Sequence, residues 1–272
     1  MPTKAFKTIK YEEYFRRLGN QFVGSIQFAG GVFGLGIDCM RELVRPPFYI
    51  YLTVEQCFLI GVRSFLLVAV TALATGSVMA LQFGYGLQKF GGQLYVPKLL
   101  ALAFVREMGP VFTSLLVAAR IGSGITAEVG SMNVTQQIDA IRALGTNPIK
   151  RIVIPRLIAT VITLPILTVM ANFIGIFGGM LVTVKELGQT PDFFFQKAVE
   201  ALRVSDFAMG FFKPVVFAVF IALTACYRGM RTTGGTKGVG DSTTWVVVTT
   251  NIFIMVSDFF LTKLFILIHP YQ

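Results

Sequence analysis

Charged side chains are scarce in this sequence. They make up 14% of its 272 residues, whereas soluble domains usually carry about 25%, and 54% of the residues are hydrophobic. This composition excludes an ordinary soluble domain and predicts an all-α integral membrane protein. Five apolar segments are long enough to cross a hydrocarbon core of about 30 Å, namely 58–84, 96–119, 152–184, 208–228 and 243–267.

Cysteine and histidine are almost as scarce. The three cysteines, Cys39, Cys57 and Cys226, form no CxxC pair and are odd in number, which favours neither a metal site nor a disulfide framework. The single histidine, His269, lies at the tail without a clustered second ligand. We therefore predict no metal site and interpret the cysteines as packing residues.

Motifs for nucleotide hydrolysis or other catalysis are missing as well. A phosphate-binding Walker A loop needs GxxxxGK followed by Ser or Thr, and the nearest stretch, Gly229 to Gly235, has glycine in place of the lysine. The sequence contains no GxSxG elbow and no HExxH motif. We predict that this chain is not an enzyme and holds no cofactor, so that any ATP and Mg²⁺ would be bound by a partner chain.

The basic residues are grouped beside the apolar segments. The formal net charge is +10, but the interleaving of basic and aromatic residues that is typical of a nucleic-acid surface is missing, so we expect no nucleic-acid partner. Eight Lys or Arg residues precede the first span or lie at its edge, and others follow the second and fourth spans. The positive-inside rule then predicts a cytoplasmic N-terminus and, with five spans, a periplasmic C-terminus. The basic start is followed by acidic residues and not by an apolar run, so we expect no cleaved signal peptide.

Residues 1–47 are predicted to form a cytoplasmic basic segment with one interfacial helix, ahead of a five-span domain over 48–272. From Tyr14 to Met40 the apolar residues recur at helical spacing, with polar residues on the opposite face. Several glycines make this stretch a poor span, and its basic flank suits an anionic membrane surface. A buried helix of the soluble type is the alternative. Arg45-Pro46-Pro47 ends the helix, because consecutive prolines do not continue one.

The connection between the second and third spans, residues 121–149, is polar but keeps a roughly helical spacing of apolar residues. It predicts one or two short cytoplasmic helices, the second capped by Thr135 and ended by Gly145 and Asn147-Pro148. This pattern leaves two interpretations open, an ordinary structured loop and a docking segment for a cytoplasmic partner. Two smaller signals are a close-packing GxxxG spacing over 175–179 and a helix start at Thr190-Pro191-Asp192.

Four ionisable residues lie within predicted spans: Arg106 and Glu107 in the second, Lys213 in the fourth and Asp258 in the fifth. Such a residue costs about 2.5–3.5 kcal/mol at a helix centre, so it usually faces a protein interior or a cavity. Two positive and two negative charges permit complete pairing, which would lower the cost of each. Ion pairs that only hold helices together are therefore one interpretation.

A lipid pathway is the other interpretation of these charges. Helical spacing places Pro110 and Ser114 on a broad face with Arg106 and Glu107. Such a face suits a crevice for a lipid headgroup and its acyl chains, because an arginine binds phosphate through its planar fork. Glu107 would then orient Arg106 or gate the cavity. We expect the opposite wall at the end of the first span, from Met79, Gln82 and Phe83.

One long stretch of the sequence, together with several shorter ones, resembles a known family. The run VREMGPVFTSLLVAARIGSGITAEVGSMNVTQQIDAIRALGTNPIKRIVIPRLIA, which begins at residue 105, resembles the signature of the MlaE/YrbE permeases. The similarity continues through LPILTV (164–169), GIFGG (175–179), FKPVVFA (212–218) and DFFLTKL (258–264). It covers most of the chain from the first span onward, and only the N-terminal forty or so residues lack a distinctive match.

The resemblance implies a permease of the bacterial inner membrane in an ABC-type transporter that works with MCE (mammalian cell entry) proteins. The implied partners are a second copy of the chain, a cytosolic ATPase bound after the second span and an extracytoplasmic MCE ring, with room for a small cytosolic accessory subunit. The implied substrate is a phospholipid or another hydrophobic lipid, and Glu107 matches a glutamate near the lipid cavity between two protomers. The positions matched to the ATPase-docking segment are Glu128, Gly130, Thr135, Gln137, Asp139 and Arg142.

Two further classes of function are compatible with the residues. The first is an ATP-independent secondary transporter or channel in which the four charges relay ions or protons; an internal inverted repeat would favour it, and the sequence shows none. The second is a membrane scaffold that only anchors an MCE ring. A response of a partner's ATPase activity to this chain would separate the permease from both.

Overall fold

The computed structural model describes residues 23, 24 and 26–268, which contain helices and connecting loops and no strand. The chain divides into two compact units, Met1–Pro46 and Pro47–Gln272. In the first unit, residues 26–43 form a helix that ends before Arg45-Pro46, as the sequence predicts. The remainder of the expected interfacial helix, over 14–22 and at 25, lies outside the described residues, as does His269.

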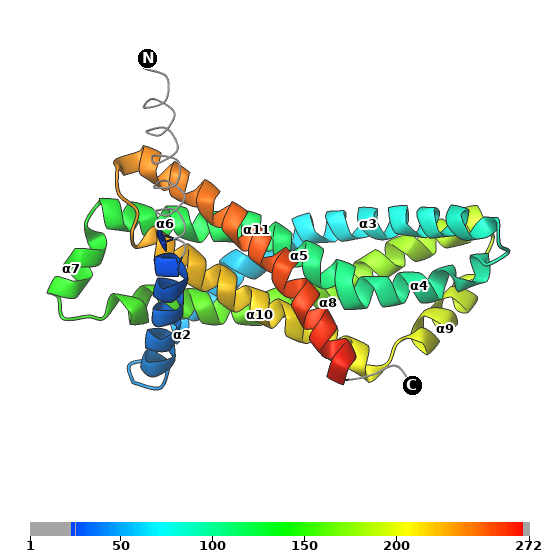
Figure 1. Ribbon diagram of the computed structural model, residues 1–272, viewed down its shortest axis with the longest axis horizontal. Coiled ribbons are helices and arrows are strands. Elements are labelled where there is room, and N and C mark those ends of the chain that lie inside the picture. Colours follow the sequence, from blue (N-terminus) through cyan, green and yellow to red (C-terminus); the bar gives the residue numbers. More distant parts are fainter. Residues whose placement is uncertain (1–22, 25, 269–272) are drawn as a thin grey trace, which may run out of the picture. The chain divides into compact units, whose positions relative to one another are not determined.

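The second unit contains five helices that are long and apolar enough to cross a membrane, and this confirms the predicted all-α fold with five spans (Figure 1). Each helix extends beyond the predicted apolar segment at both ends, because polar residues beyond the hydrocarbon core continue the helical backbone. The chain is therefore a multi-pass membrane protein. The five helices are Ile50–Gln88, Gln93–Val134, Ile149–Leu187, Val204–Gly229 and Gly235–Ile268.

Three of the five helices contain short π-helical turns, and the second also begins with a 3₁₀ turn, η2 (Gln93–Tyr95); these turns divide the helices into labelled parts. The fourth and fifth are the uninterrupted helices α10 (Val204–Gly229) and α11 (Gly235–Ile268). Two short helices, α7 (Gln137–Ala143) and α9 (Pro191–Ala201), lie in the connections. The first helix comprises α2 (Ile50–Cys57), η1 (Phe58–Val62) and α3 (Arg63–Gln88); the second comprises η2 (Gln93–Tyr95), α4 (Val96–Ala103), η3 (Phe104–Met108), α5 (Gly109–Val117), η4 (Ala118–Gly122) and α6 (Ser123–Val134); the third comprises η5 (Ile149–Val153) and α8 (Ile154–Leu187).

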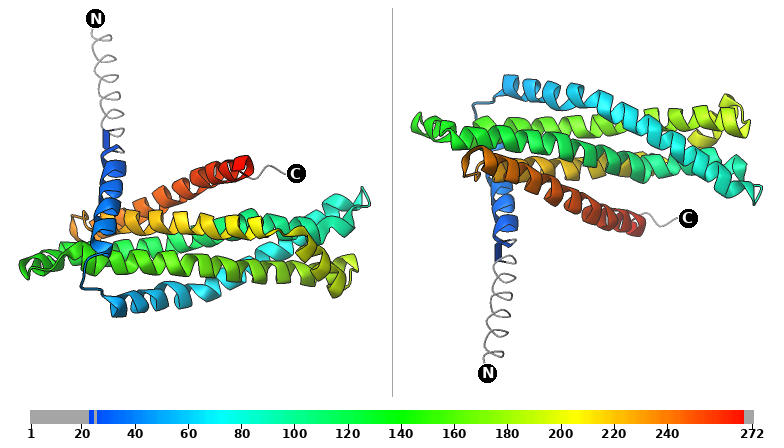
Figure 2. Two further views of the ribbon diagram at one scale, coloured as in Figure 1. Left: turned by 90° about the horizontal axis from the view of Figure 1, so that it is seen from below. Right: turned by 90° about the horizontal axis from the view of Figure 1, so that it is seen from above.

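Helices α3 and α8 run side by side and approach closely at glycines (Figure 2). A Cβ atom at Gly76 would lie 1.9 Å from the carbonyl oxygen of Gly175, and one at Gly178 would lie 2.5 Å from that of Leu73. The hydroxyl of Ser77 donates a hydrogen bond to the Gly178 carbonyl at 3.2 Å. The GxxxG spacing therefore allows the close packing that small residues give to helices in lipid.

Two apolar clusters form the core of this unit. The first joins α3, α4, α8 and α9 around Leu100, Phe104 and Phe194. The second joins α5, α8, α10 and α11 around Phe217 and Ile254. Helix α9 begins where the sequence predicts it, with the Thr190 hydroxyl accepting a hydrogen bond from the Phe193 N–H.

The connection predicted over 121–149 is only partly a separate element. Helix α6 continues the second span to Val134, and the chain then turns at Gln136, whose φ of 58° is left-handed. Thr135 does not cap α7 as predicted; its hydroxyl donates to the Ser131 carbonyl at the end of α6, because Gln136 takes the position before α7. The predicted end is confirmed, since α7 stops before Gly145, which has a φ of 74°.

Candidate functional site

The two charges of the second span lie in a π-helical turn, η3. The Gly109 N–H pairs with the Phe104 carbonyl five residues earlier, whereas an α-helix pairs residues four apart. The next residue, Pro110, has no N–H and cannot pair with the Arg106 carbonyl in the α-helical pattern. The Lys213 Nζ of α10 donates a hydrogen bond to that oxygen at 3.1 Å.

Lys213 is the centre of a buried polar cluster and is only 1% exposed. An ammonium has three N–H donors, and those of Lys213 serve the Arg106 carbonyl, Glu107 Oε2 at 2.6 Å and the Thr262 hydroxyl at 2.8 Å. Asp258 Oδ1 also lies 2.8 Å from Nζ, as an ion pair without hydrogen-bond geometry. One ammonium therefore joins the second, fourth and fifth spans and faces two carboxylates.

Thr262 completes the cluster and was not singled out from the sequence. Its hydroxyl lies 3.1 Å from Glu107 Oε1, so it connects the lysine and the glutamate. The residue lies one helical turn after Asp258, at the i+4 position on the same face. Helical spacing from Asp258 could therefore have identified it.

Arg106 forms an ion pair with Asp206 of α10. Its Nε donates to Asp206 Oδ1 at 2.8 Å, and Asp206 Oδ2 accepts the backbone N–H of Arg203 at the start of α10. Asp206 is 1% exposed and was missed because it precedes the predicted apolar segment 208–228. With Asp206 included, two basic residues face three acidic ones, so the four charges of the sequence interpretation are not the complete set.

An apolar groove of about 510 Å³ adjoins this polar cluster between α10 and α11. We call it the α10–α11 groove, and Lys213 is the only charged residue among the described residues that line it. Its volume lies within the range of about 300–1,000 Å³ that is typical of small-molecule sites. An apolar surface next to a charged cluster suits an amphiphile. The other lining residues are Ala208, Met209, Phe211, Phe212, Val215, Leu261, Leu264, Phe265 and Ile268.

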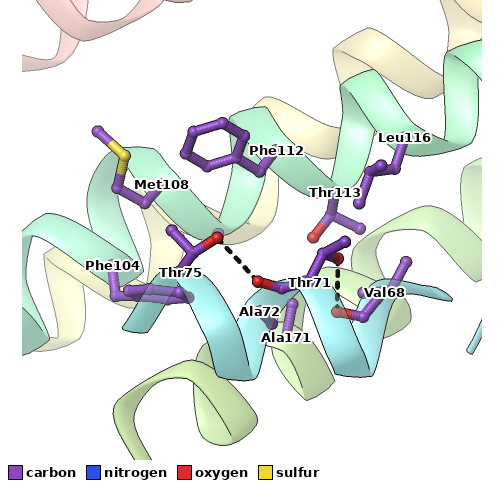
Figure 3. A pocket seen from close by; sticks show the side chains of 11 residues that line it. Val68, Thr71, Ala72, Thr75, Phe104, Met108, Phe112, Thr113, Leu116 and Ala171 are labelled. Atoms are coloured by element: carbon purple, nitrogen blue, oxygen red, sulfur yellow. Dashed lines mark hydrogen bonds between the residues drawn. The ribbon is translucent and has the colours of Figure 1, made fainter. Parts of the chain in front are cut away.

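The expected wall from the first span lies elsewhere within the chain. Met79 and Phe83 pack against the core between α3, α4 and α8, and Gln82 is exposed. Pro110 and Ser114 of the expected pathway are both buried. A void of about 10 Å³ lies between α3, α5 and α8 (Figure 3), room for at most about one water molecule. Met79, Gln82, Phe83, Pro110 and Ser114 are not among the described residues that line the α10–α11 groove or this void.

The residues expected at the ATPase-docking segment have different surroundings. Glu128 on α6 forms an ion pair of 2.9 Å with the buried Arg156 of α8. Gly130 is buried, and a Cβ atom there would lie 3.2 Å from the Thr232 hydroxyl. Thr135 is exposed beyond the end of α6. Three residues present exposed side chains on α7, namely Gln137, Asp139 and Arg142, of which the last two form a 2.9 Å ion pair.

Comparison with known proteins places the chain in a family. The family model "Permease MlaE" matches residues 53–264. A probable ABC transporter permease protein of Rickettsia prowazekii is 37% identical over 89% of this chain and 94% of its own length. The intermembrane phospholipid transport system permease protein MlaE of Haemophilus influenzae is 35% identical over 84% of this chain and 93% of its own length. The chain belongs to the MlaE permease family.

Proposed function

We propose that this chain is the permease subunit of an ABC-type transporter that moves phospholipid or a related hydrophobic lipid. The transfer would run between the inner membrane and an extracytoplasmic MCE protein, driven by a separate ATPase chain. The observation that carries the proposal is the α10–α11 groove, whose apolar surface adjoins the ion pairs around Lys213. The names of the Rickettsia and Haemophilus relatives support the same function.

The arrangement around Lys213 suits a site that changes shape. Its ammonium contacts Glu107 from the second span and Asp258 from the fifth, so a shift of either helix can leave the lysine with one carboxylate partner. This sharing limits the free-energy cost of a rearrangement, because an unpaired buried charge is expensive. Arg106 is already paired with Asp206, so a lipid phosphate that binds there would share the guanidinium with that carboxylate.

The route from the ATPase to this site follows continuous structure. Helix α6 continues α5 and η4, so a displacement that α7 passes to α6 through the turn at Gln136 would extend along one helix toward the turn η3. The ion pair between Glu128 and Arg156 links the same region to α8. The exposed face of α7 is the surface that we assign to the ATPase, and Glu128 and Gly130 act through packing.

A second copy of the chain would complete the lipid pathway. Only 6% of the apolar stretch of Gly235–Ile268 and 22% of that of Ile50–Gln88 are buried, against 56% for Val204–Gly229. The two exposed helices therefore have faces that lipid or another protomer must cover. Gln82 and its neighbours on α3 would then line the pathway across the dimer. In this proposal the N-terminus of each copy lies in the cytoplasm.

Lipid crosslinking in the assembled complex tests the assignment of Glu107. We expect Glu107→Gln to lower both transport and crosslinking of a photoreactive phospholipid to the α10–α11 groove, because the variant removes one carboxylate from Lys213. The control is Glu186→Gln, at an exposed position near the end of α8. Wild-type crosslinking and transport in the Glu107 variant would contradict the assignment.

Co-purification tests the docking surface separately. Asp139→Arg breaks the ion pair on α7 and reverses an exposed charge, so we expect less ATPase to co-purify with the permease. Asp192→Arg on α9 is the matched control, because it reverses another exposed charge at the start of a short helix. Equal recovery of ATPase with both variants would argue against docking at α7. ATPase activity that is indifferent to this chain would favour a scaffold or an ATP-independent transporter.

A further inference from the structure

A second apolar cavity lies away from the Lys213 cluster, between α8, α9 and the first turn of α10. It has a volume of about 530 Å³, and we call it the α8–α9 cavity. Asn172 is the only polar residue among the described residues that line it. Aromatic side chains form much of its wall, namely Phe173, Phe177, Phe194, Phe195 and Phe207.

The rim of the α8–α9 cavity is apolar and exposed, which in a membrane protein means contact with lipid. Phe173 and Phe177 of α8 are exposed at this rim, and so are Phe195 and Val199 of α9. Phe194, the neighbouring residue on α9, also lines the cavity and is buried in the core. Helix α9 therefore has apolar side chains both toward the core and toward the surroundings, so the cavity beneath it opens to the bilayer.

The depth of the cavity corresponds to one leaflet. Its lining residues on α8 run from Val169 to Met180, which is about 16 Å along the helix axis at 1.5 Å per residue. A whole hydrocarbon core is about 30 Å thick, so the cavity extends through about half of it. A membrane-spanning helix of a partner protein would need a groove along the full thickness. An acyl chain from a single leaflet fits this length better.

A basic residue is the sequence neighbour of a residue in the cavity wall. Arg203 directly follows the lining residue Leu202 and precedes α10, whose first turn contributes Phe207. Its backbone N–H binds Asp206, while its side chain is exposed and forms no ion pair with any residue that the structure describes. A guanidinium at the membrane surface complements a lipid phosphate.

The cavity is separate from the α10–α11 groove. Gly210 lies so close to the second span that a Cβ atom there would be 2.4 Å from the Val105 carbonyl oxygen. The α8–α9 cavity is lined by Val105 and Phe207 at this place, and it shares no residue with the described residues that line the groove. The two sites therefore have different walls.

We propose that the α8–α9 cavity binds one acyl chain of a phospholipid from the leaflet next to α9, with the lipid phosphate held by Arg203. The exposed aromatic rim admits the chain from the bilayer, and the depth of one leaflet matches it. The site is additional to the pathway around Lys213 and does not require that pathway to transport lipid.

Site-specific photocrosslinking in the full complex tests this proposal. A benzophenone amino acid replaces Val199, which lines the cavity, or Ile162, an exposed α8 residue outside it. The complex is extracted from vesicles of phosphatidylethanolamine and phosphatidylglycerol, washed with detergent and irradiated. We expect phospholipid adducts to persist at 199 and to be lost at 162. Equal loss at both positions would mean surrounding bilayer lipid only, and a protein adduct at 199 would mean a partner helix; either would overturn the proposal.

Two variants test the two parts of the site. Val169→Trp fills the deep end of the cavity and is expected to abolish lipid adducts at 199; persistence of these adducts in a correctly assembled complex would overturn the chain site. Arg203→Gln is expected to reduce phospholipid adducts about threefold or more, without changing adducts of diacylglycerol, which has no phosphate. Equal yields from both lipids in wild type and variant would overturn the role of Arg203. A probe at Phe212 reports the α10–α11 groove, so failure there alone would count against the proposed function and not against this cavity.

Discussion

Replacement of Lys213 by methionine is the most direct test of the polar cluster. Methionine retains most of the apolar stem but removes the ammonium that contacts Glu107 and Asp258. Removing one partner of a buried ion pair costs about 3–5 kcal/mol, because the remaining charge is unpaired. Glu107 is 30% exposed at its side chain, which places the expected loss near the lower end. That loss corresponds to a factor of about one hundred or more in the unfolding equilibrium.

The measurement is an unfolding titration of the purified protein in mixed micelles. The single tryptophan, Trp245, lies on α11 and reports the separation of that helix by fluorescence. We expect Lys213→Met to unfold at a lower fraction of denaturing detergent, and the triple variant with Glu107→Gln and Asp258→Asn to recover most of the loss. Lys185→Met, at an exposed position, is the control.

Two outcomes would refute this reasoning about the cluster. If Lys213→Met were as stable as wild type, the ammonium would contribute no net pairing energy. If the triple variant remained as unstable as the single one, the loss would come from packing and not from the two unpaired carboxylates.

Two further predictions concern helix packing and a surface carboxylate. Gly76→Ala is expected to destabilise the protein by about 1–3 kcal/mol in the same titration, because the new Cβ atom would meet the Gly175 carbonyl; Gly86→Ala on the same helix meets nothing within 4 Å and should be neutral. A hydrogen bond from Lys197 holds the pKa of Glu200 below its ordinary value, so the stabilisation from this pair is present above the ordinary pKa and is lost as the pH falls through the lowered one. We expect Lys197→Gln to raise the pKa of Glu200 in a carboxyl NMR titration, and an unchanged pKa would contradict that cause.

The number and order of the spans were predictable from the sequence, because apolar length alone determines which segments can cross a membrane. The end of α7 before Gly145 was predictable too, since a left-handed turn favours glycine. The partners of the charges were not predictable in the same way. Counting the four charges within the spans permitted complete pairing among them, whereas the partner of Arg106, Asp206, lies outside the apolar segment and about one hundred residues away.

Contacts between distant helices explain the other differences. Gly130 was matched by resemblance to the expected docking segment, and only the structure places it against Thr232. The α8–α9 cavity combines residues from three helices, and no local pattern identifies such a wall. Hydrophobic periodicity indicates which face of a helix is apolar but not which partner covers that face.

Pro110 also determines how α10 can align with the second span. In an uninterrupted α-helix each interior carbonyl accepts a hydrogen bond from the N–H four residues later. The backbone of such a helix therefore offers a lysine of a neighbouring helix no single preferred acceptor. The missing N–H at position 110 leaves one acceptor, the Arg106 oxygen, available to the Lys213 ammonium. The other proline of this helix, Pro97, lies in its first turns, where it frees no interior carbonyl. This acceptor therefore fixes the position of α10 along the axis of the second span. Any residue other than proline at position 110 would supply an N–H for the Arg106 oxygen and so weaken this preference for one position.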